Sequence, residues 1–131
     1  MKNILLVTIL ISLTSLNANE VTVAKDSLTL ILEENHLLSS EEKALMAIQN
    51  DNYTYIESVI NQGLLSPKTV VDGKPLIIHA AILDKPEMIL LLASYGAMII
   101  DPICEEGKNI MEHAQENNSI LAQAQIIVIR A

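Results

Sequence analysis

Residues 73–97 read GKPLIIHAAILDKPEMILLLASYGA, and this stretch decides the fold. Two apolar segments within it are separated by the short polar turn Asp84-Lys85-Pro86. Each segment has the spacing of an amphipathic helix, and Gly96 follows the second one, where a left-handed cap is expected. The stretch therefore predicts two helices, over about 73–83 and 87–95, joined by a tight turn.

The same pattern returns on both sides of this stretch at a spacing of 33 residues. Gly63 precedes Gly96 by this interval, and the last copy fits a spacing of either 33 or 34. Self-similarity of this size indicates one unit stacked on copies of itself, because such units cannot bury their apolar faces alone. At a constant spacing of 33, the equivalent residues are Leu45, Ile78 and Met111; Ile48, Ala81 and Ala114; Asp51, Asp84 and Asn117; Ile56, Ile89 and Ala122.

The flanking copies predict the remaining helices. Ser39 and Glu42 form a capping-box signature, which opens a helix over about 41–49, and a second helix follows over about 53–61. The last copy predicts helices over about 109–116 and 119–129. The segment that begins at Asp26 predicts one more amphipathic helix ahead of the first copy. The predicted fold class is all-α.

The first 18 residues have the layout of a secretory signal peptide. Lys2 precedes an apolar run from Ile4 to Leu13, and small or polar residues follow as far as Ala18. The run is shorter than the roughly 20 apolar residues that span a membrane. We therefore expect cleavage near Ala18 and a mature, soluble protein of residues 19–131 in the periplasm or outside the cell. An uncleaved amphipathic anchor is the alternative.

The charge balance excludes two classes of partner. The chain has eight basic and 16 acidic side chains, and loss of Lys2 leaves a net charge of about −9. A nucleic-acid site needs clustered Lys or Arg to displace counterions, and an anionic membrane surface makes a similar demand. Neither is expected here. The acidity would suit a partner with a basic surface, or it would serve solubility alone.

The stretch 73–97 resembles an ankyrin repeat along its whole length. The matching positions are the opening Lys74-Pro75-Leu76, the small pair Ala80-Ala81, the leucine run 90–92 and the terminator Gly96-Ala97, whereas Asp84-Lys85 replaces the usual Gly-His. The resemblance implies an ankyrin-repeat solenoid of two to three repeats, at about 40–72, 73–106 and 107–131. The helix that begins at Asp26 would be an N-terminal cap. Terminal repeats are expected to present a polar outer face.

The residues that carry chemistry elsewhere do not form a recognisable catalytic or metal site. The three histidines, His36, His79 and His113, lack the short spacings of zinc ligands, and Cys104 has no second cysteine with which to pair. No nucleophile elbow or phosphate loop is present. We therefore predict no enzymatic activity, cofactor or metal. We expect the histidines to be partly buried structural residues and Cys104 to be a half-buried loop thiol, with a cross-link from Cys104 to another chain as the alternative.

The resemblance implies a protein-interaction module in which the connectors project as hairpin fingers. Partners would lie across the finger tips and the inner helices. The candidate binding residues are Asp72, Lys74, Glu105, Glu106 and Lys108, and exposed tyrosines among Tyr53, Tyr55 and Tyr95 would add energetic anchors. The expected partner is another exported protein. Two main alternatives stay open: an accessory carrier that delivers haem or metal through His79 and His113, and an immunity or inhibitor protein. An uncharacterised hydrolase ranks last, because no nucleophile is activated.

Overall fold

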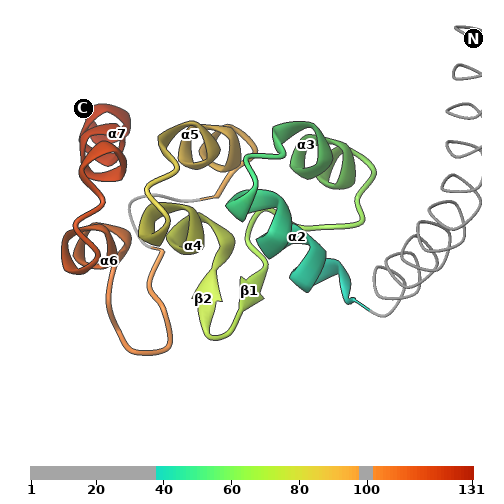
Figure 1. The fold of residues 1–131 in the computed structure, drawn as a ribbon, viewed down its shortest axis with the longest axis horizontal. Coiled ribbons are helices and arrows are strands. Elements are labelled where there is room, and N and C mark those ends of the chain that lie inside the picture. Colours follow the sequence, from blue (N-terminus) through green and yellow to red (C-terminus); the bar gives the residue numbers. More distant parts are fainter. Residues whose placement is uncertain (1–37, 98–101) are drawn as a thin grey trace, which may run out of the picture. The chain divides into compact units, whose positions relative to one another are not determined.

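The computed structural model describes residues 38–97 and 102–131. The signal peptide, the helix expected after Asp26 and His36 lie outside these residues. The described chain contains six helices and one two-stranded sheet (Figure 1). The helices are α2 (Ser40–Gln49), α3 (Tyr53–Asn61), α4 (Leu76–Ile82), α5 (Pro86–Ser94), α6 (Ile110–Glu116) and α7 (Ile120–Arg130). The strands are β1 (Val70–Val71) and β2 (Lys74–Pro75).

Consecutive helices form three pairs, α2/α3, α4/α5 and α6/α7, and a three-residue turn joins the members of each pair. The first helix of the middle pair, α4, contacts α2 and α6, and the second, α5, contacts α3 and α7. The first helices therefore form one layer and the second helices another (Figure 1). None of these helices combines the length and hydropathy that crossing a membrane requires.

The predicted helical class is confirmed for the described residues, and a short antiparallel hairpin lies between α3 and α4. β1 and β2 pair Val70 with Pro75 and Val71 with Lys74. The helix expected from Gly73 therefore begins at Leu76, because Pro75 lies in β2 with an extended backbone at the helix N-cap. Pro86, which was expected in the turn, is instead the first residue of α5. Its fixed φ and missing N–H suit that position. The described chain is thus predominantly helical.

Local capping explains why the other helix ends match the predictions closely. Ser39 and Glu42 form the expected capping box at the start of α2, with Glu42 N donating to Ser39 Oγ over 3.1 Å. Gly63 and Gly96 follow α3 and α5 with φ values of 71° and 95°. A side chain at either glycine would strain the left-handed backbone, so glycine is the fitting terminator.

The spacing between equivalent positions changes from 33 to 34 along the chain. The turn residues Asp51, Asp84 and Asn118 all have φ near 55°, and they mark the same place in the three pairs. Asn118, rather than the expected Asn117, is thus the equivalent of Asp84. α6 likewise begins 34 residues after α4. Gly63 and Gly96 keep the spacing of 33, whereas Gly73 and Gly107 are 34 apart. The extra residue therefore lies between Gly96 and Gly107.

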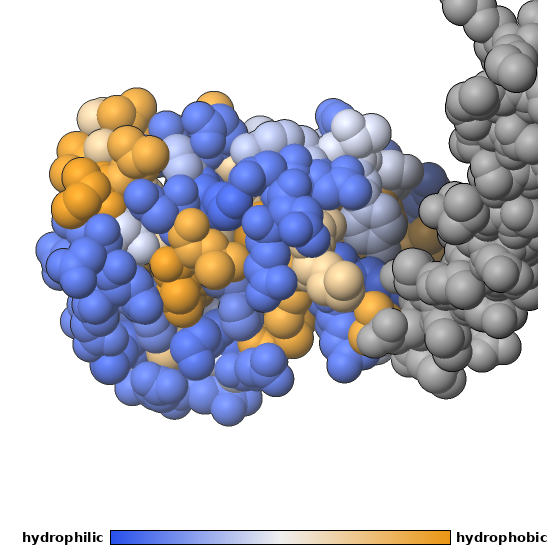
Figure 2. Space-filling model, viewed as in Figure 1, coloured by the Kyte–Doolittle hydropathy of each residue, from blue (hydrophilic) through white to orange (hydrophobic). Residues whose placement is uncertain are grey.

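The helix pairs share one aliphatic core. Every helix of the described chain contributes to it, with Ala47, Ala80 and Ala114 buried at the contacts between the first helices. The expected polar outer face of the last pair is found on α6 but not on α7. The side chains of Ile120, Leu121, Ile127 and Val128 on α7 are exposed. Figure 2 shows this apolar surface over α7 at the upper left, above the hydrophilic surface of α6.

Candidate protein-binding surface

The first connector ends in a tight hairpin tip at Asp72 and Gly73. Both residues have positive φ, 48° and 71°, which is the geometry that a two-residue type I′ turn requires and that Asp-Gly favours. His79 Nε2 lies 2.8 Å from the carbonyl oxygen of Val71. Because a carbonyl can only accept, the imidazole donates this bond and fastens β1 to α4. The tip is thus held at a defined position beside the first helix layer.

The second connector forms a similar tip at Glu105 and Glu106. Ile103 and Asn109 make a β-bridge at its base, and Cys104 N donates to the carbonyl oxygen of Lys108 over 3.0 Å. Gly107 closes the loop with a φ of 78°. Behind the tip, His113 Nε2 lies 3.1 Å from Cys104 Sγ, within hydrogen-bond distance. This buried pair anchors the second tip to α6, as His79 anchors the first tip to α4.

The two tips are joined directly. Glu105 N donates to the carbonyl oxygen of Gly73 over 2.9 Å. Lys74 Nζ lies 3.5 Å from Glu106 Oε1, and Lys108 Nζ lies 3.8 Å from Glu106 Oε2. The structure therefore brings together all five residues that the sequence nominated, Asp72, Lys74, Glu105, Glu106 and Lys108. We call this set the tip cluster.

The tip cluster has a surplus of negative charge. Lys108 also pairs with Glu116 at 2.9 Å. Their hydrogen bond raises the pKa of Lys108 and lowers the pKa of Glu116, so both stay charged at neutral pH. Within the described chain, the carboxylates of Asp72 and Glu105 have no hydrogen bond or ion pair. The lysines are thus matched by carboxylates, and two negative charges remain available to a partner.

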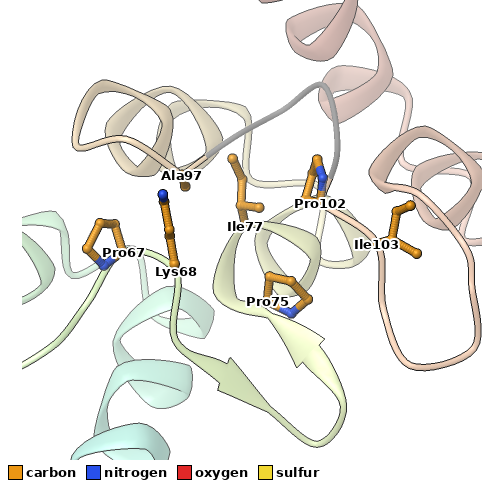
Figure 3. Close-up of a pocket in the computed structure, with 7 residues that line it drawn as sticks. All are labelled: Pro67, Lys68, Pro75, Ile77, Ala97, Pro102 and Ile103. Carbon is orange, nitrogen blue, oxygen red and sulfur yellow. The ribbon is translucent and has the colours of Figure 1, made fainter.

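An apolar groove of about 190 Å³ opens at the base of the tips (Figure 3). Ile77, buried in α4, lies at its centre, between Lys68 and Pro102. Ile103, 55% exposed, lies at one side. The groove is lined by Pro67, Lys68, Pro75, Ile77, Ala97, Pro102 and Ile103. It offers a shallow apolar recess beside an acidic edge, which suits a side chain of a partner protein.

The groove residues Pro67, Lys68, Pro102 and Ile103 were missed by the sequence analysis. Pro67 and Pro102 mark both connectors as non-helical, and this signal is visible in the sequence. The groove itself forms because two connectors lie side by side. Helical periodicity does not report which connector residues face one another.

Two titratable side chains behind the tips, His113 and Cys104, are buried. His113 is 3% exposed, and burial, followed by the nearby Lys74, lowers its pKa. The thiol of Cys104 is 5% exposed, so it is more buried than the half-buried thiol expected and cannot reach another chain without opening of the loop. Among the residues described, no three His, Cys, Asp or Glu side chains are placed to hold a metal ion.

The tyrosines lie away from the tips. Tyr53 is 36% exposed and its hydroxyl donates to Asp51 Oδ1, whereas Tyr95 is half-buried and its hydroxyl donates to Glu57 Oε1. Tyr53 borders a shallow depression on the α3/α5 layer together with Glu87, Leu90, Leu91 and Ser94. Tyr53 is therefore the tyrosine best placed for contact with a partner, but it does not extend the tip cluster.

The described chain thus combines a joined pair of loop tips, an acidic surplus and an apolar groove, and the rings of His79 and His113 contact other parts of the fold. The function of this chain is therefore inferred below from these residues and their geometry. Comparisons with models of protein families, with curated proteins and with solved structures gave no match.

Proposed function

We propose that the chain is a non-enzymatic protein-binding module of the ankyrin-repeat type that acts in the periplasm or outside the cell. Three features support the repeat assignment: the spacing of 33 and 34 residues, the two layers of paired helices, and a hairpin between the first and second pairs. The apolar leader of residues 1–18 supports export. The partner is another exported protein that presents a basic surface.

The observation that carries this proposal is the hydrogen bond from Glu105 N to the carbonyl oxygen of Gly73. It turns two loops from different helix pairs into one continuous edge. Pre-organised loops lose little conformational entropy on binding, and this favours recognition by their exposed side chains. The carboxylates of Asp72 and Glu105, which no described residue pairs, then attract a basic patch and speed its association.

The carrier alternative finds no specific support. A haem or metal carrier would use the Nε2 atoms of His79 and His113, which lie against the Val71 carbonyl oxygen and Cys104 Sγ. Ligation would break both contacts and detach both tips from their helices. Addition of haem to the purified protein provides the check: a Soret shift that is lost in His79→Ala would favour the carrier over the binding module.

Affinity capture from the native exported fraction tests the proposed surface. The double variant Asp72→Asn/Glu105→Gln removes two unpaired charges and leaves the Lys74–Glu106–Lys108–Glu116 ion pairs in place. Asparagine also tolerates the positive φ at position 72. We expect wild type to retain one protein that the variant retains at least tenfold less, with an affinity that falls as salt increases.

The matched control is Glu41→Gln/Glu87→Gln, which removes the same charge from the first turns of α2 and α5. This control should capture the partner as wild type does. Equal loss in both double variants would indicate a general effect of net charge. Retention by the tip variant would show that the tip cluster is not the binding surface.

A further inference from the structure

The outer face of α7 is an apolar stripe that the rest of the described chain leaves uncovered. Ile120, Leu121, Ile127 and Val128 are 65%, 58%, 60% and 67% exposed, and Ala124 between them is exposed as well. At 3.6 residues per turn, these five side chains fall within an arc of about 120° that is centred on Ala124. Figure 2 shows apolar surface over α7, the helix on which these five residues lie. We call this surface the α7 stripe.

The charge of the molecule limits what can cover the stripe. The chain carries a net charge of −8, so two copies repel each other wherever acidic residues would meet. α7 contains no Asp or Glu, whereas α6 beside it exposes Glu112 and Glu116. The stripe is therefore a surface on which a second copy of this acidic chain can approach without close like-charge contacts.

The apolar positions along the stripe are spaced symmetrically about Ala124. Around Ala124, Leu121 is matched by Ile127 and Ile120 is matched by Val128. A two-fold axis through Ala124 would therefore bring Leu121 of each copy opposite Ile127 of the other, and Ile120 opposite Val128, so that each apolar contact occurs twice. The small side chain of Ala124 at the centre allows the helix axes to approach to the usual 8–10 Å or closer.

We propose that the chain forms a homodimer in which two α7 helices pack antiparallel, with Ala124 facing Ala124 across the two-fold axis. Four side chains that are each more than half exposed contribute roughly 400 Å² per copy, the size of the largest apolar patch on a typical monomer. Burial of roughly 800 Å² in total is less than the roughly 1,200 Å² of a stable specific interface, so the dimer is weak and reversible. The tip cluster lies on other elements and stays accessible in the dimer.

Sedimentation equilibrium of the full chain tests the geometry. At chain concentrations on the order of 100 μM, wild type should show the mass of a dimer, whereas Ala124→Glu and Ala124→Lys should each weaken association at least tenfold. An equimolar mixture of the two variants should restore association, because opposite charges would face each other at the axis. Gln115→Glu, on the exposed side of α6, is the control and should behave as wild type. Circular dichroism checks that each variant keeps its helices.

Disulfide trapping gives a second readout that locates the contact. Ala124→Cys should form a cross-linked dimer on mild oxidation, whereas Gln115→Cys should not; the native Cys104 is buried and serves as the background. A monomeric wild type at this concentration, unchanged association in both charge variants, or equal cross-linking at positions 115 and 124 would overturn the proposal. The proposal would also be overturned if a different protein or a lipid surface bound to the stripe and no dimer of this chain had to dissociate for that binding.

Discussion

At the scale of single residues, His113 shows how a side chain that suggests a ligand can serve the fold. It lies in α6 with its ring buried, and its Nε2 faces Cys104 Sγ beneath the second tip. Burial lowers its pKa, and the positive charge of Lys74 lowers it further, whereas Glu106 and Glu116 oppose the shift. In the folded chain, His113 is therefore a neutral imidazole at neutral pH.

This pKa predicts how stability depends on pH. The folded chain binds a proton at His113 less readily than the unfolded chain, in which the pKa of this side chain is near 6.5. The contribution of neutral His113 to the free energy of unfolding is therefore complete above about pH 6.5. It is lost as the pH falls from there through the lower pKa of His113 in the folded chain. His113→Gln should cost about 1–3 kcal/mol of unfolding free energy at neutral pH, because the buried pair is broken.

The difference between wild type and His113→Gln should then shrink as the pH is lowered. Urea unfolding at a series of pH values measures it. A difference that stays constant between about pH 5 and pH 7.5 would show that His113 keeps the same protonation in the folded and unfolded chain.

At the scale of elements, the turns between paired helices connect neighbouring pairs. Ser119 at the start of α7 provides no cap of its own, because its hydroxyl donates to the carbonyl oxygen of Ile82. Asp84, in the turn of the previous pair, accepts instead from Ala122 N over 2.8 Å. Lys85 beside it pairs with Asp51 of the first turn. The Asp84-Lys85 dipeptide, which departs from the ankyrin pattern, thus links the second turn to the first turn and to the start of α7.

Substitution at Asp84 isolates this inter-pair cap. Asp84→Gly keeps the positive φ of 55° free of strain but leaves Ala122 N without its acceptor, and it should cost about 1 kcal/mol of unfolding free energy. Asp84→Asn keeps both the acceptor and the tolerance of this backbone, so it should lie close to wild type. Denaturant unfolding compares the two variants; equal stabilities would show that the cap contributes nothing.

The helices and connectors also show which features of the fold can be predicted from sequence patterns. α3 has the predicted bounds, since Asn52 and Gly63 determine its two ends through local contacts. The start of α4 was predicted too early, because Pro75 suits both a first helical turn and an edge strand. The tip cluster could be nominated since a repeat places successive connectors side by side. The groove and the α7 stripe could not, because they depend on which side chains the stacking leaves uncovered.

At the scale of the whole molecule, one aliphatic core joins the helix pairs. The chain has no Phe or Trp, and its interior is built from Ile, Leu, Met and Ala. Ile78 in α4 is fully buried, and α4 packs against α2, α5, α6 and α7. Because every helix contributes to this core, the outer pairs depend on the middle one. The tip cluster keeps its geometry only while the second and third pairs remain packed together.

The shared core is the central claim, and two tryptophan reporters test it directly. Tyr53→Trp reports on the first pair and Met111→Trp on the third, each with and without Ile78→Val in the middle pair. Denaturant unfolding followed by fluorescence should give coincident midpoints for both reporters, and Ile78→Val should lower stability by the same amount, about 1 kcal/mol, at both. Separate midpoints, or a loss seen by one reporter alone, would contradict the account.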